Sequence, residues 1–196
     1  THTRYTPVEE QGRMIVISHG PFMEAMQPFV NWKNQKGIPT TIVNVSTIGN
    51  NTTAIKNYIQ KEYNLNDGLA FILLIGDGSQ IATPSAAGGS SDPSYALLEG
   101  NDNYPDIFVG RFSAENITQV QTQVTKTVHY ERDLVSGDWL KKGMGIASSE
   151  GAGIGDNGEA DWVHMDIIRN KLLDYTYSTV DQVYANNGGN ATMITN

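Results

Sequence analysis

The 196-residue sequence contains no cysteine. Disulfide bonds, thiolate metal sites and a cysteine nucleophile supplied by this chain are therefore excluded. Basic residues are also scarce: 13 Lys and Arg stand against 21 Asp and Glu, which gives a net charge of −8. Nucleic acid binding needs a basic surface, so we expect no nucleic acid partner. An acidic surface suits calcium or substrates that carry Lys or Arg, and it also promotes solubility.

Long apolar runs are missing as well. No run approaches the roughly 18 residues of a membrane-spanning helix, and no secretory signal pattern opens the sequence, so we expect no membrane span. The glycine loop at residues 151–158 lacks the Lys and Ser/Thr of a phosphate-binding P-loop. No Gly-x-Ser-x-Gly elbow of a serine hydrolase occurs either. Nucleotide binding and serine catalysis are thus disfavoured.

Short apolar runs alternate with stretches in which apolar residues recur at helical spacing. Six runs rich in apolar or β-branched residues predict strands, at residues 13–18, 40–45, 69–75, 107–112, 143–147 and 179–184. Helical patterns lie between them, one at about 114–134, and Asn51 and Asn116 are placed as helix caps. This alternation predicts an α/β fold with a mainly parallel sheet. The irregular stretch at 79–104 is long for a compact domain, which favours a functional or ligand-ordered loop.

Polar residues are concentrated in residues 146–164, IASSEGAGIGDNGEADWVH. Glu150 follows a short apolar run, and a loop with four glycines leads to Glu159, Asp161 and His164, where a helical pattern begins. Asp77 follows the run at 69–75, so it should lie at the same sheet edge as Glu150, the edge where ligands of parallel sheets bind. From residue type alone, these acids can equally be strand-end, helix-capping or turn-forming residues.

Six segments carry a further pattern, and they are residues 5–17 (YTPVEEQGRMIVI), 29–37 (FVNWKNQKG), 73–77 (LLIGD), 99–113 (EGNDNYPDIFVGRFS), 128–134 (VHYERDL) and 146–164. In this order they resemble the gingipains, the cysteine endopeptidases of peptidase family C25 in clan CD. The resemblance covers nearly the whole chain and is closer to the arginine-specific than to the lysine-specific gingipains. It implies a caspase-like, Rossmann-like three-layer sandwich, with a mainly parallel sheet flanked by helices on both faces.

The resemblance implies roles for two acids of the polar stretch. Glu150 matches the acid that orients the catalytic histidine. Asp161 matches the carboxylate at the floor of the S1 pocket, which pairs with a substrate Arg. A planar guanidinium suits such a carboxylate because the two groups can form two parallel hydrogen bonds.

The resemblance also implies bound Ca2+. The matching positions are Asp77, Glu99, Asp102, Tyr104, Asp106, Glu159 and His164. Glu99 and Tyr104 would contribute backbone carbonyls to one loop, and Glu159 with His164 would form a further metal-linked pair. Calcium takes about six to eight oxygen ligands, so alternating carboxylates and carbonyls in a tight loop suit it. A calcium ion would also explain how so long a loop is ordered.

The same resemblance predicts how the chain is divided. Residues 1–12 form an amino-terminal arm, in which residues 1–4 match a propeptide tail or a cloning remnant. Residues 13–196 form the amino-terminal subdomain of a gingipain-like catalytic domain. The family's catalytic His and Cys lie beyond residue 196, so this chain alone should be inactive. The complete protein is expected to be secreted or on the bacterial cell surface, to act on proteins or peptides with Arg at P1, and to need the remaining catalytic subdomain as partner.

Alternatives to this interpretation remain open. The chain can be a non-catalytic, calcium-binding module of the C25 type, reused for binding or as a scaffold. A flavodoxin-like or receiver domain is disfavoured because acids crowd the strand ends and no partner Lys can be placed. His19 follows a strand and is next to Gly20, as in the clan's His-Gly motif, but it follows the wrong strand. His129 lies in a predicted helix, so we expect neither histidine to be catalytic.

Overall fold

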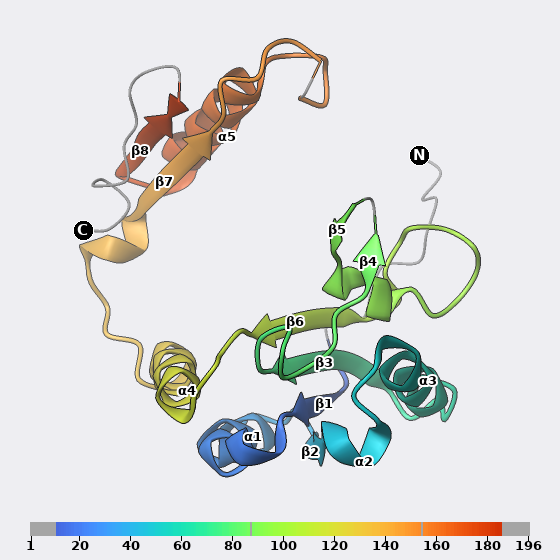
Figure 1. Ribbon diagram of the computed structural model, residues 1–196. Helices are drawn as coiled ribbons and strands as arrows, with labels where there is room; N and C mark the ends of the chain where they lie inside the picture. The colour runs from blue at the N-terminus through green and yellow to red at the C-terminus, as the bar shows by residue number, and fades with distance from the viewer. Residues whose placement is uncertain (1–10, 87, 154, 186–196) are drawn as a thin grey trace. The chain divides into compact units, whose positions relative to one another are not determined.

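The computed structural model describes residues 11–86, 88–153 and 155–185. The chain forms two compact units, residues 1–134 and 135–196 (Figure 1). The predicted arm at residues 1–12, with its proposed propeptide tail, lies outside the described residues except for its last two positions.

The first unit is built on a four-stranded parallel sheet. Its strands are β1 (Arg13–Ser18), β2 (Thr40–Asn44), β3 (Leu69–Ile75) and β6 (Phe108–Phe112), in the order β2-β1-β3-β6. The most apolar run of the sequence, LAFILLI, forms β3 and lies inside the sheet between β1 and β6. This position follows from its composition, because a strand buried on both faces needs apolar side chains on both.

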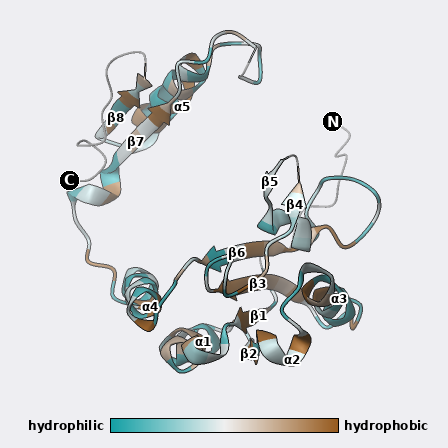
Figure 2. Cartoon of the chain, in the orientation of Figure 1, coloured by the Kyte–Doolittle hydropathy of each residue, from teal (hydrophilic) through white to brown (hydrophobic). Residues whose placement is uncertain are grey.

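Helices cover both faces of this sheet, and the buried apolar residues form two clusters, one on each face. The strands of the sheet are coloured mainly as hydrophobic, whereas the helices are mixed (Figure 2). Met14 and Val16 pack with α1 (Gln27–Gln35) and α4 (Ile117–Arg132), whereas Ile15 and Ile17 pack with α3 (Thr52–Tyr63). Successive strand residues point to opposite faces, so one strand serves both cores. The predicted α/β class, with a mainly parallel sheet flanked by helices on both faces, is confirmed.

Asparagine side chains set three helix starts. The Oδ1 atom of Asn51 accepts a hydrogen bond from the Ala54 backbone at 2.9 Å, and that of Asn116 accepts one from Gln119 at 3.0 Å. Both predicted caps are confirmed, and α4 accordingly begins after Asn116 rather than at residue 114. The predicted strand at 40–45 is one residue too long, because Asn44 caps the short helix α2 (Val45–Ile48).

The remaining elements of the first unit are short. Two 3-10 turns, η1 (Gly20–Phe22) and η2 (Glu24–Met26), precede α1. The long polar stretch contains a hairpin, β4 (Ser85–Ala86) with β5 (Gly89–Ser90), followed by the 3-10 turn η3 (Asp92–Ala96). Protein contacts therefore order much of the stretch that the sequence marked as irregular.

The second unit is a single parallel βαβ crossover. After the 3-10 turn η4 (Asp138–Lys141), β7 (Lys142–Ala147) pairs with β8 (Thr179–Tyr184), and α5 (Asp161–Tyr175) connects them. Gly145 of β7 faces this helix: a Cβ at this position would lie 3.1 Å from the Cε of Met165, so a side chain there would have to shift the Met165 tip. In the part of the chain that is described, no helix is both long and apolar enough to cross a membrane.

Candidate functional site

Glu150 and Asp161 come together where β7 ends and α5 begins. Asp161 is the first residue of the helix, and its Oδ2 accepts a hydrogen bond from the Ser148 backbone at 2.6 Å. The Asp161 backbone donates to the carbonyl of Glu150 at 3.3 Å, and the Ser148 hydroxyl donates to Glu150 Oε2 at 3.2 Å. A carboxylate is stabilised at a helix amino terminus by the helix dipole. Ser148 thus holds two predicted site residues in one short segment.

Glu159 and His164 are in direct contact, and the pair is ionic when His164 is protonated. Glu159 Oε1 lies 2.6 Å from His164 Nδ1, and Glu159 Oε2 accepts from the Asn157 backbone at 2.8 Å. The bond to Glu159 raises the pKa of His164, and the bond to His164 lowers the pKa of Glu159. Gly155 lies beside this carboxylate: a Cβ there would lie 2.4 Å from Glu159 Cδ, so a larger residue would displace the Glu159 side chain. Gly155 thus leaves room for the carboxylate that faces the imidazole.

Asp77 lies just beyond the carboxyl end of β3. Its carboxylate accepts a hydrogen bond from the Ser113 hydroxyl at 3.0 Å, and Ser113 follows β6. A hydrogen bond from the Gly78 backbone and the bond from Ser113 lower the pKa of Asp77. Asp77 and Glu150 each lie beyond the carboxyl end of a strand, but β3 and β7 belong to different sheets, so the structure does not show the shared sheet edge that we expected.

The acids of the predicted calcium loop are held by backbone amides. Asp106 Oδ2 accepts from Leu98 at 2.6 Å and from Glu99 at 2.8 Å. Asp102 Oδ1 accepts from the Tyr104 backbone at 3.0 Å. Within the described ranges, no three Asp, Glu or His side chains gather closely enough to hold a metal ion. A cation in this loop would therefore need backbone carbonyls as well, which are the donors that the family resemblance assigns to Glu99 and Tyr104.

Comparison with known proteins decides the family. The family model described as Peptidase family C25 matches residues 8–196. The chain belongs to peptidase family C25. Gingipain R2 of Porphyromonas gingivalis is 41% identical to this C25 chain over 188 residues, which are 93% of this chain and 26% of that protein. Lys-gingipain of the same organism is 30% identical over 156 residues, 74% of this chain and 9% of that protein.

A solved structure shows the same relationship in three dimensions. The crystal structure of the Arg-specific cysteine proteinase gingipain R matches with a TM-score of 0.85 and 39% identity, over 92% of this chain and 43% of that one. The resemblance to the gingipains, closer to the arginine-specific members, is confirmed, and so is the caspase-like fold. The C25 chain spans about a quarter of the length of gingipain R2.

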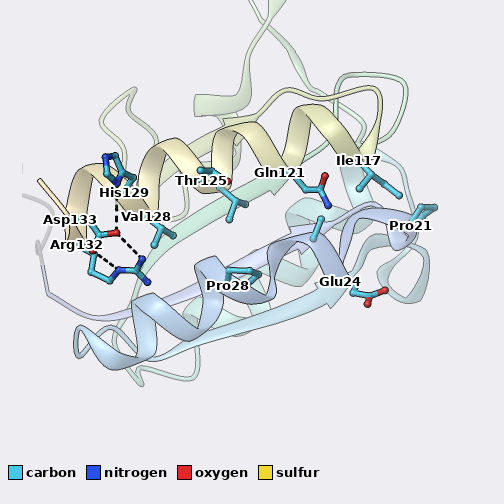
Figure 3. A pocket seen from close by; sticks show the side chains of 12 residues that line it. Pro21, Glu24, Pro28, Ile117, Gln121, Thr125, Val128, His129, Arg132 and Asp133 are labelled. Atoms are coloured by element: carbon cyan, nitrogen blue, oxygen red, sulfur yellow. Dashed lines mark hydrogen bonds and ion pairs between the residues drawn. The ribbon is translucent and has the colours of Figure 1, made fainter.

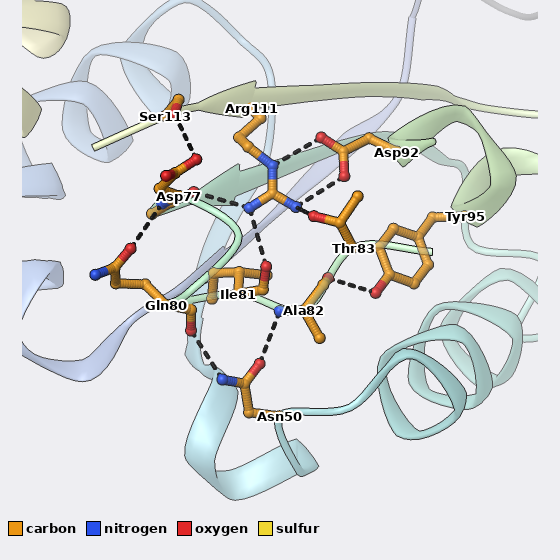
Figure 4. Close-up of polar contacts among 11 residues, drawn as sticks. Asn50, Asp77, Gln80, Ile81, Ala82, Thr83, Asp92, Tyr95, Arg111 and Ser113 are labelled. Carbon is orange, nitrogen blue, oxygen red and sulfur yellow. Dashed lines mark hydrogen bonds and ion pairs between the residues drawn. The ribbon is translucent and has the colours of Figure 1, made fainter. Parts of the chain in front are cut away.

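A polar centre that the sequence did not mark lies in the first unit of the C25 chain (Figure 4). Arg111 of β6 donates to both carboxylate oxygens of Asp92 at 2.7 Å. It also donates to the carbonyls of Gly76 at 2.8 Å and Ile81 at 3.2 Å, and to Thr83 Oγ1 at 2.8 Å. All five guanidinium N–H groups are thereby used. The sequence signal that could have revealed this centre is Arg111 itself. A charged residue inside an otherwise apolar strand needs a partner when it is buried.

The C25 chain also has a wide groove between its helices (Figure 3). The groove has a volume of about 760 Å³ and is lined by residues of η1, η2, α1 and α4 and by Asp133, among them Pro28, Gln121 and His129. His129 is exposed and lies 3.7 Å from Asp133. None of the predicted site residues lines this groove. The groove is therefore separate from the predicted site residues, although part of the segment 128–134 lines it.

Proposed function

We propose that this chain is the amino-terminal subdomain of a secreted cysteine endopeptidase that hydrolyses peptide bonds after Arg. The observation that carries the proposal is the position of Asp161, held by the Ser148 amide at the start of α5 beside Glu150. The motif containing both acids lies within the segment matched by the C25 family model and by gingipain R2. An acid fixed by a backbone amide at a helix start is well placed to bind a cationic side chain.

The residues of this chain would act on binding and orientation. In the complete protein, a cysteine thiolate attacks the scissile carbonyl, and a histidine acts as general base and then as general acid. Both groups would come from the remaining catalytic subdomain, beyond residue 196. Glu150 would orient that histidine, and Asp161 would bind the P1 guanidinium. The Ser148 bond holds one Asp161 oxygen at 2.6 Å and so fixes the direction of the carboxylate.

The experiment that tests the proposal is a cleavage assay on the complete protein. Three otherwise identical peptides would carry Arg, Lys or Gln at P1, and product formation would be measured before and after alkylation of thiols. We expect cleavage of the Arg peptide and its loss on alkylation. Equal cleavage of the Gln peptide, or activity that survives alkylation, would contradict it. No cleavage at all would support the second candidate, a non-catalytic C25-like binding or scaffold module.

We extend the proposal to calcium and to location. Two donor sets are suggested by the resemblance and consist mainly of oxygen atoms: the loop with Asp102 and Asp106, and the Glu159–His164 pair. Asp77, at the end of β3, would be a further ligand. Calcium would neutralise these acids and stiffen the loops that carry them. We also propose that the complete protein reaches the culture medium or the bacterial cell surface; peptidase activity found only inside lysed cells would argue against this.

Calcium binding at Glu159 should lower the pKa of His164. Without metal, Glu159 raises this pKa. Protonated His164 therefore stabilises the fold fully below its unfolded-state pKa, and the contribution is lost as the pH rises through the raised value. A cation held by both Glu159 and the His164 imidazole would compete with the proton on His164 and so favour the neutral ring. NMR titration of the imidazole in EDTA and in calcium measures the difference, with exposed His129 as the control. The same His164 pKa in both solutions would remove this pair from the metal sites.

A further inference from the structure

A lysine of α3 reaches the carbonyl groups at the end of the η3 turn. Lys56 Nζ donates to the carbonyls of Ser94 at 2.9 Å, Tyr95 at 3.3 Å and Leu97 at 2.5 Å. An ammonium group has three N–H donors, so these bonds use all of them. Backbone carbonyls that converge on one positive charge are also the arrangement that proteins offer to hard metal ions. Lys56 therefore occupies a place that a bound cation could otherwise fill.

The Asp106 carboxylate binds backbone amides directly after the same turn. Asp106 accepts from the backbone of Leu98 and Glu99, and its own backbone donates to the carbonyl of Ala96 at 2.9 Å. The positive charge of Lys56 interacts electrostatically with the Asp106 carboxylate. Partial burial lowers the pKa of Lys56, and the Asp106 carboxylate opposes this shift. One turn is thus held by a positive group at its carbonyls and by a negative group at its amides, both belonging to the protein.

The turn has a second anchor in the apolar core. Tyr95 and Ala96 are fully buried, and the Tyr95 hydroxyl donates to the Ala82 carbonyl at 2.7 Å. Loss of the ammonium would leave three carbonyls of this partly buried turn without a donor, which costs free energy for every group that water does not reach. The order of the turn should accordingly depend on Lys56.

We propose that Lys56 is an internal cation that keeps residues 94–106 ordered without a metal, so that calcium meets a loop that is already folded. The inference goes beyond the proposed peptidase function. The role of Lys56 in ordering residues 94–106 does not depend on whether the complete protein cleaves peptides, because it concerns only the conformation of this segment. It also assigns a function to α3, a helix that carries none of the predicted site residues.

Hydrogen exchange of the complete protein tests the proposal. Exchange of the amides of Leu98, Glu99 and Asp106 would be compared in EDTA and in calcium, for the wild type and for Lys56→Met. We expect the wild-type amides to be protected in EDTA. Lys56→Met, which keeps the length of the side chain but not its charge, should exchange these amides at least about tenfold faster, because three hydrogen bonds are lost. Lys61→Met, an exposed change on the same helix, should leave them unchanged.

Two results would overturn the proposal. In the first, the wild-type amides lose protection in EDTA and regain it in calcium, so that a metal orders the loop. In the second, Lys56→Met folds and protects the loop as well as the wild type does. If Lys56→Met fails to fold, the milder Lys56→Gln tests the role of Lys56 in the same way, and the wild-type comparison between EDTA and calcium still tests whether the loop is ordered without a metal. Peptidase activity does not enter the readout, so failure of this proposal is distinct from failure of the proposed function.

Discussion

Asp161→Asn in the complete protein is expected to lower kcat/KM for an Arg peptide by about 10²–10³-fold, because the proposed charge pair between Asp161 and the P1 guanidinium would be lost. The substituted side chain keeps an oxygen that can accept the hydrogen bond from the Ser148 amide, so the start of α5 should remain in place. A neutral amide cannot form the charge-assisted, two-pronged bond that a guanidinium makes with a carboxylate. The kcat/KM for a Gln peptide should therefore change much less.

A control variant tests whether the effect of Asp161→Asn comes from the proposed site or from the loss of any negative charge on α5. Asp174 lies on α5 and is exposed, and Asp174→Asn removes the same charge from the same element. This variant should retain the selectivity for Arg over Gln. Both variants are compared through kcat/KM for the two peptides and through their melting temperatures. Wild-type selectivity in Asp161→Asn would falsify the S1 assignment.

Arg111→Leu is expected to destabilise the first unit by about 3–5 kcal/mol, the usual cost of removing one partner of a buried ion pair. The side chains of Arg111 and Asp92 are 11% and 22% exposed, so water can replace little of the lost bonding. The substitution leaves Asp92 without its counter-ion. It also deprives the carbonyls of Gly76 and Ile81 of their donor. Hydrogen exchange of the β3 and β6 amides in urea gives the free energy of unfolding. These amides should exchange faster in Arg111→Leu than in the wild type.

An exposed ion pair provides the control for this stability measurement. Arg132 donates to Asp133 at 2.7 Å, but the Arg132 side chain is 53% exposed. Exposed pairs contribute little, because water solvates both partners when the pair is broken. Arg132→Leu should leave the exchange of β3 and β6 unchanged. Equal effects of the two substitutions would show that the Arg111 contacts do not hold the sheet edge.

Arg111 and Lys56 change how the long polar stretch is understood. Its length and composition favoured a loop ordered by a ligand, and a calcium ion would explain that order. The structure shows two protein cations already bound to its backbone: Arg111 at Ile81, and Lys56 at the end of η3. Calcium remains a proposal for the acids of this stretch. Much of the order of the stretch, however, has a source within the chain.

The sequence alone determined the local features of this protein. The apolar run of β3, the caps Asn51 and Asn116 and the alternation of strands and helices depend on neighbours a few residues away, so the α/β class and most element positions could be read directly. The family motifs could be recognised for the same reason, since each is a short run of fixed residues. Val45 shows where the local sequence is not sufficient to assign an element: its β-branched side chain suits a strand, but the Asn44 cap places it in α2.

Only the tertiary structure decided which polar groups meet. Arg111 pairs with Asp92 across 19 residues, and Lys56 reaches carbonyls 38 to 41 residues away. The sequence contains 21 acidic residues and many more carbonyls as possible partners, and no periodicity selects among them. The choice follows from the crossover connections, which carry α3 and β6 past the same loop. Desolvation then makes each pairing necessary, because a charge left unpaired in such a place would cost several kcal/mol.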